Sequence, residues 1–316
     1  PAGHTAPAGT PAPRGNVGRP LGVRVERVLG DVPVDEVQDL TVRAFAGQES
    51  LTPPSGALSE SARDVAADFA AGGGLLLRAD DGRLLATCRV RRLGLAWVIR
   101  RCAVDPAYRR QAVGRRLLAE AHAWAAQDGA VRAHVGVRDA LAANRAFWES
   151  NGYRELTRHG GFWTELARPL SLHLAGPEQT HELGRRLAAD LRPGDLVVLS
   201  GPLGAGKTAL TQGIGAAFGV RGRVTSPTFV LARVHPGPVP LVHVDAYRLR
   251  DAGGRLELDD LDLDASLPDS VTVVEWGEGI VEGLTESRLE IRLDIPSDDT
   301  RIAHVTPVGP RWSVFG

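Results

Sequence analysis

The sequence has little of several things that often define a protein class. Among its 37 cationic side chains one is a lysine, Lys207, and all the others are arginines. It has two cysteines, Cys88 and Cys102, both in apolar segments typical of strands, which favours packed thiols in a reducing compartment over a disulfide or a metal site. A net charge of −1 argues against a general nucleic-acid binder, because affinity for phosphates needs a surplus of cations.

Long apolar runs are also missing. No segment approaches the ~20 apolar residues that span a bilayer, so we expect no membrane segment. Residues 1–21 are rich in Pro, Ala and Gly, which is typical of a disordered tail rather than a signal peptide and indicates a cytoplasmic protein. The 316 residues, 43% hydrophobic and 24% charged, suit two globular domains.

The single lysine lies in a glycine-rich segment, Gly201-Pro-Leu-Gly-Ala-Gly-Lys-Thr208. Arginine is a wide planar fork and lysine a compact ammonium, so a tight phosphate-binding loop is one place where they do not interchange. The segment matches the full P-loop pattern and lies between an apolar strand, Leu196–Ser200, and a helix that ends near Phe218. It predicts an ATP site in which backbone N–H groups and Lys207 bind phosphates and Thr208 binds Mg²⁺.

Two carboxylates directly follow apolar strands, at Asp245 and Glu275. Ligand sites of α/β proteins lie at the carboxyl edge of the sheet, where either acid could hold the metal or its water. Their spacing does not rank them, and for either one a solvated acid at a strand end is the alternative interpretation.

Four ordered motifs in the second half resemble the TsaE family, the ATPase subunit of bacterial tRNA threonylcarbamoyladenosine synthesis. They are the P-loop, Thr225-Ser-Pro-Thr-Phe229, His243-Val-Asp-Ala-Tyr-Arg-Leu249 and Val274-Glu-Trp-Gly-Glu278. The resemblance covers about Leu172 to Ile295 and includes Thr180-x-x-Leu-Gly184. One departure is Pro202, where many relatives carry an acidic residue.

The resemblance implies Mg²⁺-dependent ATP hydrolysis with Lys207, Asp245 and Glu275 as catalytic residues and with Thr208 and Glu275 as metal ligands. It also implies a switch-like loop at Ser226-Pro-Thr228 and docking on the TsaB and TsaD transferase subunits, with tRNA contacted only through that complex. The ATP-binding residues implied are Thr180, Gly201, Gly204, Ala205, Gly206, Lys207, Thr208, Ala209 and Trp276.

The first half resembles the GNAT acetyltransferases over about Val23 to Leu166. The resemblance is carried by Val104-Asp-Pro-Ala-Tyr-Arg-Arg-Gln-Ala-Val-Gly-Arg-Arg-Leu-Leu118 before an amphipathic helix, and by Asn144-Arg-Ala-Phe-Trp-Glu-Ser-Asn-Gly-Tyr153. A loop of backbone donors at a helix start can bind a pyrophosphate. The acetyl-CoA contacts implied are Cys102, Val104, Gln111, Ala112, Val113, Gly114, Arg115 and Asn144.

Two departures bear on activity of this first half. Ala112 stands where glycine is usual and adds a methyl group near the phosphates. Trp148 stands where many relatives have a tyrosine that acts as general acid, and indole cannot supply that proton. We expect Tyr153 to pack in the core. The acceptor amine is not encoded in any motif.

The predicted fold is therefore α/β with two domains: a GNAT-like mixed sheet over 22–168, then a P-loop α/β sandwich over 169–300, followed by an extension over 301–316. The predicted function is a TsaE-like ATPase fused to an acetyl-CoA-dependent N-acetyltransferase. A P-loop small-molecule kinase is one alternative, although no substrate lid is evident between the motifs. A scaffold gated by nucleotide and CoA, with an inactive acetyltransferase domain, is the other.

Overall fold

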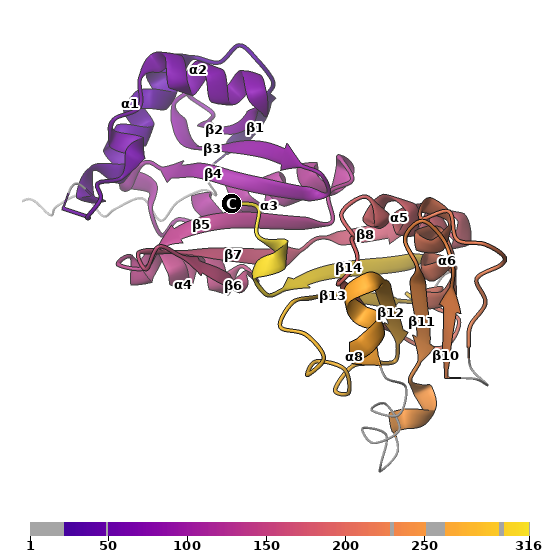
Figure 1. The fold of residues 1–316 in the computed structure, drawn as a ribbon. Helices are drawn as coiled ribbons and strands as arrows, with labels where there is room; N and C mark the ends of the chain where they lie inside the picture. The colour runs from indigo at the N-terminus through magenta and orange to yellow at the C-terminus, as the bar shows by residue number, and fades with distance from the viewer. Residues whose placement is uncertain (1–21, 49, 228–230, 251–262, 297–299, 316) are drawn as a thin grey trace, which may run out of the picture.

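The computed structural model describes residues 22–48, 50–227, 231–250, 263–296 and 300–315. They form two α/β domains, each built on a seven-stranded mixed sheet, with the two sheets next to one another (Figure 1). The predicted fold class is confirmed. Within these residues no helix combines the length and the apolar character needed to cross a membrane. The predicted tail over 1–21 lies outside the described residues.

The first domain opens with a strand and two helices before its sheet continues. Its elements are β1 (Val23–Val28), α1 (Val34–Phe45), η1 (Ala46–Gln48), η2 (Gly56–Leu58), α2 (Ala62–Ala71), β2 (Gly74–Ala79), β3 (Leu84–Leu93), β4 (Ala96–Val104), η3 (Pro106–Tyr108), α3 (Val113–Gln127), β5 (Arg132–Arg138), α4 (Ala142–Ser150), β6 (Arg154–His159) and β7 (Trp163–Pro169). A capping box between Ser61 and Asp64 starts α2. The Asp81-Gly82 turn joins β2 to β3, as its sequence predicts.

The first sheet has the strand order β1-β2-β3-β4-β5-β7-β6. Helices α3 and α4 pack on one face and α1 and α2 on the other. Strands β4 and β5 are parallel but pair only from Ala96↔Arg132 to Val98↔His134. Because β4 runs on to Val104 and β5 to Arg138, the two strands part after that point and open the sheet between them.

In the second domain the P-loop follows β9 and leads into α6, the second of the domain's two long helices. Its elements are β8 (Ser171–Leu174), α5 (Pro177–Ala188), β9 (Leu196–Ser200), α6 (Lys207–Ala217), β10 (Ala232–His235), β11 (Leu241–Asp245), η4 (Tyr247–Arg250), α8 (Leu263–Ser266), η5 (Leu267–Asp269), β12 (Val271–Glu275), β13 (Arg288–Asp294), β14 (Arg301–Val308) and η6 (Pro310–Trp312). The strand order is β10-β11-β12-β9-β13-β14-β8, with β11, β12, β9 and β13 parallel. Strand β14 lies inside this sheet, between β13 and β8, so the second domain extends beyond the predicted boundary at residue 300.

Helices α5 and α6 cover one face of the second sheet, and α8 covers the other. The two long helices approach closely through glycines. A Cβ added to Gly184 would lie 2.1 Å from the Leu210 carbonyl oxygen, and one added to Gly213 would lie 1.9 Å from that of His181. This contact holds α6, which begins at Lys207, firmly against the domain.

Candidate nucleotide-binding and acyl-transfer sites

The P-loop joins β9 to α6 at the carboxyl edge of the second sheet. Gly201 has φ +134°, and a Cβ there would lie 2.2 Å from the Leu293 carbonyl oxygen, so a side chain does not fit. Gly206 caps α6 with φ +101°, a conformation that favours glycine. The first N–H groups of a helix have no partner inside it, and the start of α6 therefore offers donors and partial positive charge to an anion.

Lys207 lies inside this loop with 5% of its surface exposed. Its Nζ donates to the carbonyl oxygens of Gly201 at 2.9 Å and Pro202 at 3.1 Å, and lies 3.9 Å from the centroid of the Trp276 ring. Burial lowers the pKa of Lys207, and the nearby carboxylates of Glu275 and Asp245 oppose that shift without cancelling it. The Lys207 ammonium is therefore held by two backbone carbonyl groups and the face of an indole ring, partners that a phosphate can replace.

The two predicted acids lie side by side, because Asp245 and Glu275 are register partners on parallel strands. The Thr208 hydroxyl donates to Glu275 Oε1 at 3.0 Å, and Asp245 accepts from the Ser226 hydroxyl at 3.2 Å and from the Tyr247 N–H at 3.1 Å. A hydroxyl and a buried carboxylate in contact form the hard oxygen set that suits Mg²⁺ shared with phosphates. The Thr208 and Glu275 oxygens thus fit the metal that the P-loop pattern implies.

His243, which was not among the predicted site residues, contacts the same carboxylate, that of Glu275. Its side chain is fully buried, and Nε2 lies 3.0 Å from Glu275 Oε1, the oxygen that also accepts from Thr208. His243 precedes Asp245 by two residues on β11, so strand alternation places both on one face. This alternation along β11 is the sequence signal that could have indicated His243.

The remaining predicted nucleotide residues surround the same loop. Thr180 is buried beside it, and a Cβ on Gly206 would lie 3.2 Å from its methyl group. Ala205 is buried, Gly204 is exposed and Ala209 is half-buried in α6. Trp276 directly follows Glu275 with φ +62° and packs on Tyr247. Of the predicted switch loop, Thr228 and the adjoining Phe229 lie outside the described residues.

The opening between β4 and β5 holds a cavity of about 320 Å³. It passes through the sheet, since it is lined by Asn144 and Trp148 of α4 on one side and by Phe45 and Gln48 near the end of α1 on the other. The predicted contact Cys102 lines it from β4. Both cysteines are free thiols, and burial raises the pKa of Cys102 to about 12.

The loop between β4 and α3 turns its backbone sharply at two residues. Arg110 has φ +65° and Ala112, which caps α3, has φ +62°. Successive N–H groups in such a turn form an anion-binding concavity, and the start of α3 adds its own unpaired donors. Val104 is half-buried at the end of β4, and Gln111, Val113, Gly114 and Arg115 follow along this loop and helix start.

Trp148 lines this cavity and Tyr153 does not, and neither is a ready proton donor to a leaving thiolate. Trp148 is 3% exposed and donates from Nε1 to Asn144 Oδ1 at 3.1 Å. Tyr153 is fully buried, as expected, with its hydroxyl 2.8 Å from His122 Nε2. Burial raises the pKa of Tyr153 well above its ordinary value and lowers that of His122 to about 3. Neither of these two groups is a ready acid at neutral pH.

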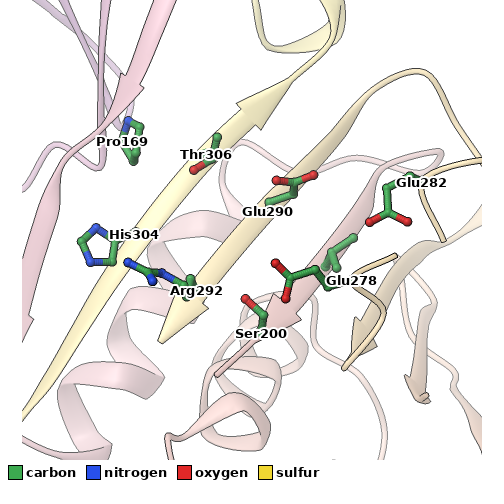
Figure 2. A pocket seen from close by; sticks show the side chains of 9 residues that line it. Pro169, Ser200, Glu278, Glu282, Glu290, Arg292, His304 and Thr306 are labelled. Carbon is green, nitrogen blue, oxygen red and sulfur yellow. The ribbon is translucent and has the colours of Figure 1, made fainter. Parts of the chain in front are cut away.

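A second hollow, of about 220 Å³, lies on the face of the second sheet away from α5 and α6. Figure 2 shows Glu278, Glu282 and Glu290 around it, with Arg292 and His304 at its other end. Burial lowers the pKa of His304. None of the residues predicted for ATP or acetyl-CoA lines this hollow.

A P-loop with two acids at the sheet edge defines the second domain as a nucleotide-binding ATPase fold, and the parted β4 and β5 define the first as an acyltransferase fold. The family model described as threonylcarbamoyl adenosine biosynthesis protein TsaE matches residues 174–303, and the acetyltransferase (GNAT) family model matches residues 39–153. The chain belongs to the TsaE family through its second domain, and its first domain is a GNAT acetyltransferase domain.

Individual relatives match one domain each. The chain is 64% identical over 140 residues to the tRNA threonylcarbamoyladenosine biosynthesis protein TsaE of Streptomyces coelicolor, a match that covers 42% of this chain and 93% of the relative. Bacillus subtilis YdiB is 34% identical with a TM-score of 0.38, over 45% of this chain and 88% of YdiB. The PaiA N-acetyltransferase from Thermoplasma acidophilum, solved in complex with coenzyme A, is 14% identical with a TM-score of 0.41, over 46% and 98% of the two chains.

Proposed function

We propose that the second domain hydrolyses ATP with Mg²⁺ in support of tRNA threonylcarbamoyladenosine formation, acting in the cytoplasm with TsaB and TsaD and meeting tRNA only through them. The observation that carries this is the contact of Thr208 and Glu275 beside the buried Lys207. When bound, Mg²⁺ would neutralise charge on the terminal phosphates. Lys207 exchanges its carbonyl partners for phosphate oxygens, and Asp245 orients the attacking water.

The test is ATP hydrolysis by the purified full chain, alone and with TsaB and TsaD, with tRNA modification scored by mass spectrometry. We expect the partner subunits to change turnover and modified tRNA to accumulate only when this chain is present. A kinase would consume ATP only when given its acceptor, and a nucleotide-gated scaffold would show slow turnover that the partners do not alter. Either pattern would overturn the proposal.

For the first domain we propose N-acetyl transfer from acetyl-CoA to an amine. The amine nitrogen attacks the thioester carbonyl carbon, the C–N bond forms and the C–S bond breaks. No side chain protonates the leaving group, so the thiolate of CoA takes a proton from water. The amine proton passes to solvent. The support is the cavity through the sheet and the donor-rich start of α3.

Release of free CoA thiol that depends on an added amine would establish the activity, and binding of acetyl-CoA without release would show a CoA-gated scaffold.

A further inference from the structure

The stretch after β14, Gly309–Phe315, leaves the ATPase sheet and returns to the first domain; we name it the return segment. Figure 1 shows it in yellow, running from β14 to the sheet of the acetyltransferase domain. It includes η6 and is described throughout. Its end contacts the first domain, where Phe315 packs on Trp163.

Contacts in both domains hold the return segment in place. Arg311 forms hydrogen bonds to both carboxylate oxygens of Asp195, at 3.0 and 2.9 Å, and Trp312 is 2% exposed. On the acetyltransferase side the Ser313 hydroxyl donates to Glu165 Oε2 at 2.5 Å and the Val314 N–H to Glu165 Oε1 at 3.1 Å. A fixed segment can place a side chain accurately.

Glu165, which receives the return segment, is itself fully buried. His134 Nδ1 lies 2.7 Å from its Oε1 and His159 Nε2 lies 3.2 Å from its Oε2. Burial raises the pKa of Glu165, but the hydrogen bonds from His134, Ser313 and Val314 outweigh it and hold the pKa below its ordinary value. The carboxylate that anchors the segment is therefore charged at neutral pH.

Phe315, at the far end of the segment, lines the cavity between β4 and β5. Its ring meets that of Trp163 edge to face, with centroids 5.2 Å apart. Trp163 is held from its other side by His159, stacked at 4.0 Å. A Cβ on Gly136 would lie 3.2 Å from Trp163 Cζ3 and 3.9 Å from Phe315 Cζ, so both rings lie next to the β5 backbone at this residue.

The neighbours of Phe315 on β5 show on which side of the first sheet it lies. Val135 and Val137 of β5 belong to the core under α3, so Gly136 between them faces the opposite side. The start of α3, with its anion-binding donors, marks the side from which CoA enters. Phe315 and Trp163 therefore lie on the side left for the acceptor.

We propose that Phe315, carried by the ATPase domain, is the wall that selects the acceptor amine of the acetyltransferase domain. The inference rests on the acetyl transfer proposed above. Phe315 touches none of the bonds that form or break in that step, and acts by filling space beside the attacking nitrogen. The acceptor class that fits is a primary amine with a slender, unbranched substituent, because branched or aromatic substituents would overlap the Phe315 ring.

The test compares acceptor profiles of the full chain and its Phe315→Ala variant. CoA thiol release is measured with primary amines graded from ethylamine to branched and aromatic amines, with the KM for acetyl-CoA measured in parallel. We expect Phe315→Ala to raise kcat/KM for the bulky amines relative to ethylamine by about tenfold or more, with an unchanged KM for acetyl-CoA. Phe162→Ala, at an exposed aromatic that does not line the cavity, should leave the profile unaltered. The same profile in Phe315→Ala and wild type overturns the proposal.

A second readout separates this proposal from failure of acetyl transfer itself. Cys102 lines the same cavity, so its alkylation by small iodoacetamide and by a bulky maleimide, followed by mass spectrometry, reports access without any acceptor. Both reagents meet the same thiol, so the ratio of their rates is independent of its raised pKa. We expect Phe315→Ala to raise the relative rate of the bulky reagent several-fold and Phe162→Ala to leave it alone. If the ratio of the two alkylation rates is the same in Phe315→Ala and wild type, the proposed role of Phe315 is wrong, even if acetyl transfer is found.

Discussion

At the scale of single residues, the solitary lysine is explained by the space around it. The Lys207 ammonium fits between two carbonyl oxygens and the Trp276 ring, and a guanidinium is too wide for that place. We expect Lys207→Arg, like Lys207→Ala, to lower kcat/KM for ATP hydrolysis by about 100- to 1,000-fold, the usual effect of removing a donor to developing charge. The reverse exchange at an exposed position of the same domain, Arg221→Lys, should leave the rate alone. Substantial hydrolysis by Lys207→Arg would show that charge alone suffices.

His243 should act through Glu275 rather than on ATP. Its Nε2 and the Thr208 hydroxyl meet the same carboxylate oxygen, so removing the imidazole frees Glu275 to turn. We expect His243→Ala to raise the Mg²⁺ concentration needed for half-maximal hydrolysis about 10- to 100-fold, the usual effect of losing a partner of a metal ligand. ATP binding without Mg²⁺ should be kept.

His235→Ala is the matched control for that prediction. His235 is also buried, and its ring centroid lies 6.4 Å from that of His243, so a general loss of packing would affect both variants alike. If His243→Ala and His235→Ala need the same Mg²⁺ concentration for half-maximal hydrolysis, His243 does not position Glu275.

The residues predicted for the nucleotide site follow each other in short motifs. The P-loop, Asp245 and Glu275 could therefore be proposed from strand ends and spacing, and the structure places them close together. The contact from His243 to Glu275 joins different strands, and the positive φ of Trp276 results from the sharp exit of the chain after β12. The alternation along β11 could have placed His243 beside Asp245, but no local spacing indicates the contact with Glu275 on the next strand or the backbone turn at Trp276.

At the scale of elements, the contact between α5 and α6 depends on having no side chain at Gly213. A Cβ there would lie 1.9 Å from the His181 carbonyl oxygen of α5, so the helices must separate to admit it. We expect Gly213→Ala to lower the free energy of unfolding by about 1–3 kcal/mol, the usual cost of overpacking, measured by thermal denaturation. Ala216→Ser, on the exposed side of the same helix, should have little effect, and an equally stable Gly213→Ala would mean that the helices adjust freely.

The loop before α3 contains a strain that glycine would relieve. Ala112 has φ +62°, a conformation that costs a non-glycine residue about 1–2 kcal/mol. We expect Ala112→Gly to raise the thermal stability slightly and to tighten acetyl-CoA binding, measured by calorimetry, because a methyl group leaves the anion site. Weaker binding in this variant would mean that the methyl group packs usefully against the cofactor.

Strands and helices were predicted best where apolar periodicity is strong. The strand expected at Leu196–Ser200 and the helix expected to end near Phe218 are present as β9 and α6. Strands β10, β13 and β14 were not predicted, and β14 contains Pro307, a residue type that is typical of an edge or a loop. The structure accommodates that proline since β8 pairs only with Arg301 to His304, before Pro307 is reached.

At the scale of the whole molecule, the two domains share one core. Leu95, Val131 and Ala167 of the first domain belong to the same apolar cluster as Leu172, Leu187 and Trp312 of the second. Polar contacts also cross the boundary, including Arg132 with Asp190 at 3.1 Å and Arg186 with the Gly129 carbonyl. Separate motifs predicted two domains, but no motif predicted this junction, because its residues are spread along the chain and meet only in the folded molecule.

Trp312 is the side chain whose loss should uncouple the domains. It is buried in the shared core, with the guanidinium groups of Arg311 and Arg132 4.7 and 5.7 Å from its ring. We expect wild type to unfold in one calorimetric transition, and Trp312→Ala to lose about 3–5 kcal/mol and to show two transitions, since each sheet keeps its own helices. Trp124→Ala removes a half-buried tryptophan that lies within the first domain. It should destabilise that domain but leave the shared core intact. A single transition in Trp312→Ala, merely shifted to lower temperature, would mean that the polar contacts alone couple the two domains.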